Sequence, residues 1–207
     1  MLLTEWIFVF GLLGLSTMLN ILVPISGSAT VTPLIALFAD PHHAIGITTF
    51  VFFLSAPPRI FFFWNNIQWK EVQVLLFPSV IAALVGALSL VAIPEDWLLI
   101  IILLFSIYFL LKKLGLVLSL KRSGQFSGYA AALLSGFLQG TSISGSDLRN
   151  QYLYAQNLKI QDIHGTTALI GGANFLVASF VRFNTGHLTA PDIIFLLVFF
   201  IVRAFGE

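Results

Sequence analysis

The chain has 207 residues, of which 58% are hydrophobic and 9% are charged, and its mean hydropathy is +0.98. These values lie outside the range of soluble domains and indicate an integral membrane protein. The formal net charge of +1 and the lack of a long basic tract argue against nucleic acid as a partner, and the absence of cysteine excludes disulfides, thiolate metal sites and cysteine nucleophiles.

The first half of the sequence predicts four membrane crossings and one short helix. Trp6 to about Leu22 is long enough to cross most of the roughly 30 Å of hydrocarbon, and Pro24 ends it. The segment 30–39 contains Pro33 and is too short to cross, so it is predicted as a half-helix or re-entrant segment that is buried in protein. The other crossings are predicted at residues 45–64, with a kink at 55–58, and at 72–93 and 98–118.

The second half repeats this order. A helix is predicted from Tyr129 to about Leu138, followed by a polar short segment at 147–157, a crossing at 163–183 and the start of another at 191–205. We therefore divide the chain into a first membrane repeat, residues 1–120, and a second, residues 121–207. A partner for the 98–118 crossing would begin near position 215, past the last residue, so the second repeat is expected to lack its final helix.

An identical four-residue string supports this duplication. Ile25-Ser26-Gly27-Ser28 recurs as Ile143-Ser144-Gly145-Ser146, 118 positions later, and the same shift aligns Thr48-Thr49 with Thr166-Thr167. Paired breaks of this kind are typical of transporters whose broken helices bind substrate near mid-bilayer. The predicted fold is an all-α membrane protein made of two homologous helical repeats, each with a broken or re-entrant half-helix.

The direction of the two repeats follows from counting crossings. Lys112, Lys113, Lys121 and Arg122 form a basic cluster, which is predicted to be cytoplasmic because short basic loops stay on that side. With the segment 30–39 taken as re-entrant, the first repeat has an even number of crossings. The sequence therefore predicts that the repeats are parallel rather than inverted.

A known family shows the same features. The break followed by Pro33, the Gly46 to Thr49 segment, the Asn65 to Trp69 turn and their echo after a basic central loop resemble the sulfite exporter TauE/SafE family over essentially the whole chain. The resemblance implies a multi-pass carrier of the prokaryotic inner membrane that exports sulfite, sulfonates or related small anions. The chain departs from the family pattern in having Ser-Gly-Ser at both breaks instead of a run of glycines. The family's proline after the second break is also absent.

Arg149 is the most informative candidate, because it follows the second break in a segment predicted to dip into the membrane. A charge there is costly and usually functional, and a guanidinium binds sulfonate, sulfite or carboxylate oxygens through two parallel hydrogen bonds. The alternative is a structural ion pair with Asp147. Asp147 itself is either a proton-coupling carboxylate or the N-cap of the following half-helix.

Small and hydroxyl-bearing residues complete the predicted site. Backbone N–H groups at the breaks attract anions when they lie at half-helix N-termini, although close helix packing explains small residues equally well and threonine often bonds to its own helix. Arg59 and Arg182 are expected to reach the headgroups from the cytoplasmic ends of their helices. The predicted substrate-binding residues are Ser26, Gly27, Ser28, Thr48, Thr49, Ser144, Gly145, Ser146, Arg149, Asn150, Thr166 and Thr167.

These observations predict a secondary transporter that exports a small anion, such as sulfite or an organosulfonate, by alternating access. No nucleophile elbow, phosphate-binding loop or zinc-protease motif is present, so an enzyme is not expected, and neither is a metal or another cofactor. The expected partners are the anion, the lipid bilayer, protons for coupling and further copies of the chain. Two alternatives stay open, namely a passive anion channel and a non-transporting scaffold or receptor subunit.

Overall fold

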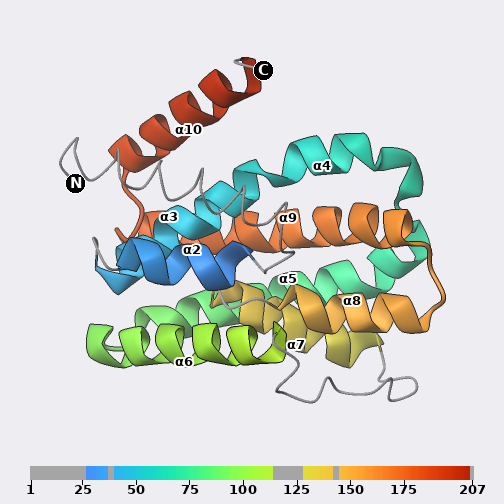
Figure 1. The fold of residues 1–207 in the computed structure, drawn as a ribbon, viewed down its shortest axis with the longest axis horizontal. Helices are drawn as coiled ribbons and strands as arrows, with labels where there is room; N and C mark the ends of the chain where they lie inside the picture. Colours follow the sequence, from blue (N-terminus) through green and yellow to red (C-terminus); the bar gives the residue numbers. More distant parts are fainter. Residues whose placement is uncertain (1–26, 37–39, 114–127, 142–144, 206–207) are drawn as a thin grey trace.

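The computed structural model describes residues 27–36, 40–113, 128–141 and 145–205, and in these ranges the chain is helical except for short connections (Figure 1). The described part contains no strand, and three of its helical segments are long and apolar enough to cross a membrane: Pro41–Phe62, Trp69–Val91 and Ile160–Asn184. Large apolar side chains such as Phe61, Phe62 and Phe77 are more than 70% exposed, as expected of a surface that meets lipid. The predicted all-α membrane fold is confirmed.

The helices follow the predicted order, and most begin within a few residues of the expected positions. The predicted first crossing and the break residues Ser26 and Ser144 lie outside the described ranges. The elements are α2 (Gly27–Ala36), α3 (Pro41–Leu54), α4 (Ala56–Phe62), a 3-10 turn (Trp64–Asn66), α5 (Trp69–Val91), α6 (Glu95–Lys113), α7 (Gly128–Gly140), α8 (Ser146–Ala155), α9 (Ile160–Asn184) and α10 (Ala190–Phe205).

The predicted kink separates α3 from α4. Pro57 and Pro58 have no backbone N–H to continue the helical hydrogen bonds of α3, and the chain turns at Ser55, whose hydroxyl donates to the Phe52 carbonyl at 2.8 Å. The kink gives α4 its own direction beside α9.

Two glycines of α7 bring that helix against the backbone of α5. A Cβ atom added at Gly136 would lie 2.1 Å from the carbonyl oxygen of Ser79, and one added at Gly140 would lie 2.1 Å from that of Ala83. The spacing of four residues on both helices places these contacts one turn apart on a single face. The close approach of α5 and α7 therefore depends on the glycines of α7.

The segment α3–α4 runs antiparallel to α9. The ring of His42 stacks on that of His187 with centroids 4.4 Å apart, Phe52 stacks on Phe175 at 5.5 Å, and Ala56 of α4 lies against Gly172. Residue numbers thus rise along one partner as they fall along the other. These two segments hold the same place in the two predicted repeats, so the prediction of parallel repeats is wrong.

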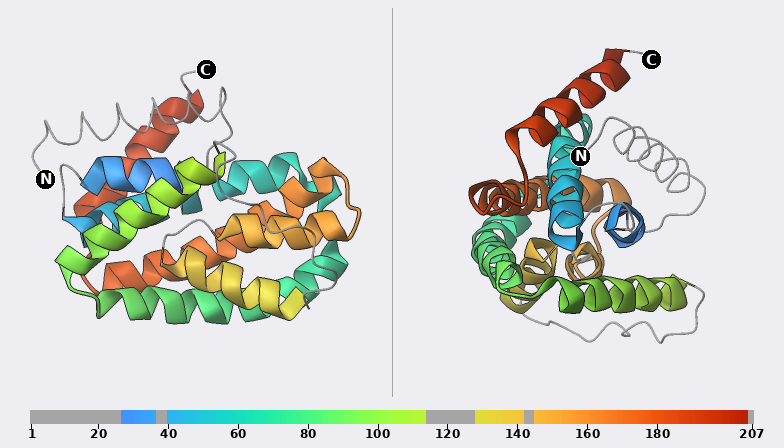
Figure 2. Two further views of the ribbon diagram at one scale, coloured as in Figure 1. Left: turned by 60° about the horizontal axis from the view of Figure 1, so that its bottom comes forward. Right: turned by 90° about the vertical axis from the view of Figure 1, so that its left-hand side faces the viewer.

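The second half contains two helices that are too short to cross. In the second half, where both short helices are described, α7 has 13 residues and α8 has 10, or about 20 Å and 15 Å at 1.5 Å per residue. They pack as an antiparallel hairpin that enters and leaves on the same side of the molecule (Figures 1 and 2). The apolar run before α2, for which the sequence predicts a full crossing, lies outside the described residues.

The two half-helices point away from each other. Figure 1 shows α2 and α8 running outward in opposite directions from the middle of the long axis, so that their N-terminal ends face the centre of the molecule. Helix α2 packs on α3 and α6, whereas α8 packs on α7 and α9. The centre of the fold is therefore surrounded by the ends of short helices.

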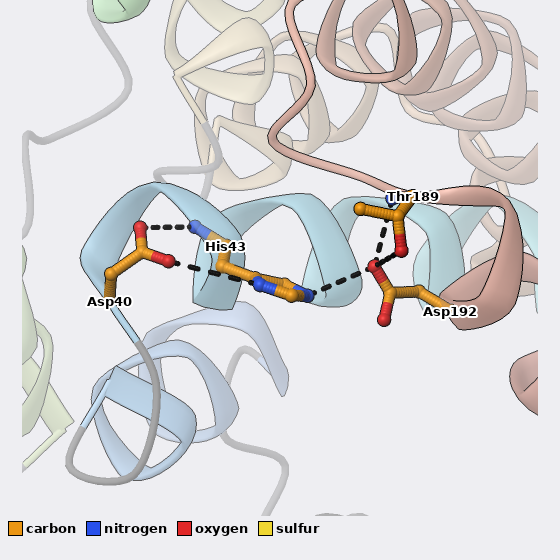
Figure 3. Close-up of polar contacts among 4 residues, drawn as sticks. All are labelled: Asp40, His43, Thr189 and Asp192. Carbon is orange, nitrogen blue, oxygen red and sulfur yellow. Dashed lines mark hydrogen bonds and ion pairs between the residues drawn. The ribbon is translucent and has the colours of Figure 1, made fainter. Parts of the chain in front are cut away.

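The last helix is held by a polar contact at one end of the bundle. The carboxylate of Asp192, in the first turn of α10, lies 3.0 Å from Nε2 of His43 in α3 and accepts hydrogen bonds from the backbone N–H and hydroxyl of Thr189 (Figure 3). In the adjoining loop, burial lowers the pKa of His187, and the nearby His42 lowers it further. A neutral His187 ring stacks on His42 without charge repulsion.

Candidate functional site

A pocket of about 230 Å³ lies where the kinked segment α3–α4 meets α8 and α9. Its described wall is contributed by five helices, α3, α4, α7, α8 and α9, and by the connection between α3 and α4. The lining residues are Phe52, Ser55, Ala56, Arg59, Gln139, Ser146, Arg149, Asn150, His164, Thr167, Ala168, Gly171, Gly172 and Phe175.

Arg149 lies in the first turn of α8 and is fully buried on the wall of this pocket. Its Nη1 donates to the side-chain oxygen of Gln139 at 2.8 Å and its Nη2 to the carbonyl of Thr167 at 3.5 Å. Its Nε has no hydrogen-bond partner within the described part of the chain. A buried guanidinium held by neutral oxygens keeps its positive charge uncompensated, which is costly unless an anion joins it.

A hydrogen-bonded chain of neutral side chains fixes the position of Arg149. The side-chain oxygen of Gln139, on α7, also accepts from Nδ2 of Asn174 at 2.7 Å, and the same Nδ2 donates to the hydroxyl of Ser79 at 2.7 Å. Helices α5, α7, α8 and α9 are joined by these bonds. The guanidinium is therefore oriented by four helices rather than by one flexible neighbour.

Two adjacent glycines of α9 allow the neighbouring elements to approach. A Cβ added at Gly171 would lie 3.4 Å from Nη2 of Arg149, and one added at Gly172 would lie 2.8 Å from Cβ of Ala56 in α4. Gly171 thus faces the guanidinium, while Gly172 faces α4. Together they bring the arginine of α8 and the residues of α4 to the same pocket.

The charges around the pocket are of one sign. The charged groups of its described lining are the guanidinium groups of Arg59 and Arg149, and this lining contains no aspartate or glutamate. The remaining polar lining consists of hydroxyls, amides and the imidazole of His164. Such a wall favours an anion, because a cation would meet repulsion and no compensating carboxylate.

The predicted site residues divide into those that line this pocket and those that pack elsewhere. Ser146, Arg149, Asn150 and Thr167 are on its wall, where the hydroxyl of Thr167 donates to the side-chain oxygen of Asn150 at 2.8 Å. Asp147 is the second residue of α8, whose N-cap is Gly145, so the prediction that Asp147 is the N-cap is wrong. It is half-buried and is not among the described lining residues.

The other predicted threonines make hydrogen bonds within the helix framework. Thr48 and Thr49 donate to the carbonyls of Ala44 and Ile45 in their own helix, at 2.7 and 2.6 Å. The hydroxyl of Thr166 accepts from the backbone N–H of Gln68 at 3.0 Å, at the start of α5. Thr48 and Thr49 thus bond to their own helix, which is the alternative to substrate binding that the sequence allows for threonine, and Thr166 bonds to the start of α5.

The glycine of the second break is also found in a packed position. Gly145 precedes α8, and a Cβ there would lie 2.1 Å from the carbonyl oxygen of Ser135. Gly27 and Ser28 form the start of α2, and neither is among the described lining residues of the pocket. In the described structure, the first break therefore contributes a helix end near the centre, and the second contributes Ser146 and the residues after it.

Sequence reasoning missed the role of two arginines. Arg182, expected to reach the headgroups, is fully buried in α9, where its Nη2 donates to the carbonyl of Gly140 at 2.7 Å and its Nε to the hydroxyl of Thr49 at 3.2 Å. Arg59 is exposed but lines the pocket. A signal for Arg182 was present: the carbonyls at the end of a helix that stops inside a membrane need donors, and a cation is favoured there.

The comparisons with known proteins identify the family of the chain. The family model described as Sulfite exporter TauE/SafE matches residues 7–205, nearly the whole chain. No match was found among curated proteins or among solved structures. An all-helical membrane fold and an acid-free pocket with a buried arginine fit a family that transports anions of the sulfite and sulfonate type, and the chain belongs to the sulfite exporter TauE/SafE family.

Proposed function

We propose that this protein exports a small sulfur oxyanion or organosulfonate across a prokaryotic inner membrane by alternating access, with the anion bound beside Arg149. The observation that carries the proposal is the buried guanidinium of Arg149, which has neutral hydrogen-bond partners, an Nε without a described partner and a place on the wall of an acid-free pocket. An oxyanion in the pocket supplies the missing negative charge and accepts the remaining N–H.

The arrangement of helices supports the alternating-access part of the proposal. Helices α3–α4 and α9 run antiparallel, and α2 and α8 point outward from the centre in opposite directions (Figure 1). Carriers built from inverted repeats bind substrate between such halves and rock one against the other. The pocket lies between α4 of one half and α8 and α9 of the other, so a rocking motion would open and close it.

Export of sulfite from liposomes that contain the purified protein tests the proposal. Replacing Arg149 by Ala is expected to lower the export rate at least about tenfold, because the anion loses its charged hydrogen-bond donor. Lys159→Gln is the matched control, since it removes one positive charge from an exposed position outside the pocket lining. Wild-type export by the Arg149 variant, with the control also unchanged, would place the binding site elsewhere.

The same liposomes separate a coupled carrier from a passive channel. A carrier driven by protons loses uphill accumulation when the proton gradient is collapsed, whereas a channel keeps downhill flux. Asp147 stays the predicted coupling group. Asp147→Asn should abolish the dependence on the gradient if that prediction is right and leave it unchanged if the carboxylate only stabilises the first turn of α8.

A further inference from the structure

The pocket has a second cation that the proposed function does not use. Arg59 comes from α4 and Arg149 from α8, and both helices contact α9. Both arginine side chains line the same pocket. Neither has a carboxylate beside it in the described lining. With only a singly charged anion in the pocket, one of the two positive charges would stay uncompensated.

The elements that carry the two arginines both lie against α9. Gly171 faces the guanidinium of Arg149 at ordinary contact distance, and Gly172 admits Ala56 of α4 to a contact that an added methyl group would break. Arg59 follows Ala56 by three residues in the same short helix, less than one turn away. Adjacent positions on α9 therefore face the Arg149 guanidinium and the helix that carries Arg59.

The volume of the pocket allows an anion to reach both groups. About 230 Å³ is several times the roughly 30 Å³ that one water molecule takes in the liquid. A small organic anion with a charged group at each end fits in this space, as does a compact doubly charged oxyanion. The neutral amide and hydroxyl groups of Gln139, Asn150 and Thr167 provide further hydrogen bonds along the wall.

We infer that the pocket selects dianions, with Arg149 holding one negative charge at the buried end and Arg59 holding the other, which makes Arg59 a determinant of charge specificity. The inference rests on the proposed function and narrows its substrate class. Charge-assisted hydrogen bonds to a guanidinium are stronger than those between neutral groups. Removal of Arg59 therefore lowers the affinity for dianions far more than the affinity for monoanions.

Binding of three anions to the whole purified protein at pH 8.5 tests this inference. The probes are sulfite, sulfoacetate and isethionate; the last two are nearly equal in size and share a sulfonate, but sulfoacetate carries two negative charges and isethionate carries one. The wild-type protein is expected to bind sulfoacetate at least about tenfold more tightly than isethionate. Arg59→Gln should weaken the binding of sulfite and of sulfoacetate about tenfold or more, and it should change the affinity for isethionate less than about threefold.

The controls separate charge from folding and from the proposed function. Arg59→Lys keeps the charge and should keep most of the preference, while Lys159→Gln should bind like wild type. Arg59 is exposed on its helix, so its variants should unfold at the wild-type temperature. Equal wild-type affinity for sulfoacetate and isethionate, or dianion binding that Arg59→Gln leaves unchanged, overturns the inference while the proposed function stands. Failure of all three anions to bind the wild-type protein overturns both.

Discussion

At the scale of single residues, the two buried arginines have different tasks. Arg182 donates hydrogen bonds to the Gly140 carbonyl, the last of α7, and to the hydroxyl of Thr49. It therefore supplies a donor to a carbonyl at a helix end that lies inside the protein. Arg149 is held by oxygens that belong to otherwise complete interactions, because the Gln139 oxygen also accepts from Asn174. The first arginine completes the fold, whereas the second adds a charge to a pocket.

This difference predicts opposite effects of removing each charge. Arg182→Met should lower the free energy of unfolding by about 1–3 kcal/mol, because it leaves the buried Gly140 carbonyl without its donor. Arg149→Met should leave stability unchanged or raise it, because it removes a buried charge that no described carboxylate compensates. Thermal unfolding of both variants measures the two effects. A large loss of stability in Arg149→Met would show that this residue is mainly structural.

At the scale of elements, the contact between α5 and α7 depends on the absence of side chains. Gly136 and Gly140 lie one turn apart on α7, each with the space of a Cβ atom taken by a carbonyl oxygen of α5. Helices in lipid gain no hydrophobic driving force from meeting each other, so such close packing is a main source of their association. The same face of α7 carries Gln139, which orients Arg149.

Methyl groups at these glycines are therefore expected to separate the helices. Gly136→Ala and Gly140→Ala should each lower the free energy of unfolding by about 1–3 kcal/mol, measured by thermal unfolding in detergent. Gly171→Ala is the matched control, because its added carbon would lie at 3.4 Å from Arg149 and 3.5 Å from Gln139, at the edge of ordinary contact. Equal stability in all three variants would mean that α7 shifts along α5 without cost.

The elements could be predicted from sequence because hydropathy and proline mark them locally. Half-helix α8, the kink at Ser55 and the crossings of α5 and α9 lie within a few residues of the expected positions. Contacts between distant residues leave no such mark. His43 and Asp192 meet at the base of α10, and Arg59 joins Arg149 at one pocket, although neither pair shares a motif in the sequence.

The direction of the halves illustrates the same limit. Whether an apolar run crosses the membrane or turns back in the middle depends on where the next helix packs, and the sequence around α7 fits both outcomes. In the folded chain, the stacking of His42 on His187 and of Phe52 on Phe175 shows that α3 and α9 run in opposite directions. Of the residues that line the pocket, Arg149 of α8 could be proposed from its costly charge alone, whereas the contribution of Arg59 from α4 required the fold.

At the scale of the whole molecule, the pocket joins two parts that a rocking motion would move toward each other. Helix α4 carries Arg59, and α8 carries Arg149 in the opposing half. Like charges repel more strongly as water leaves the space between them. In the proposed carrier, the pocket without an anion would therefore oppose closure, and a bound anion would remove that opposition.

A carrier with this property returns slowly when it is unloaded. Efflux of labelled sulfite should accelerate several-fold when unlabelled sulfite is present on the far side of the liposome membrane, because a loaded return step avoids the electrostatic self-repulsion of the two guanidinium groups. Arg59→Gln should reduce this trans-stimulation, as one of the repelling charges is gone. Equal efflux with and without external anion would show that the vacant carrier reorients freely. The paired arginines would thus make the protein an exchanger by default and a net exporter only where another force drives the empty return.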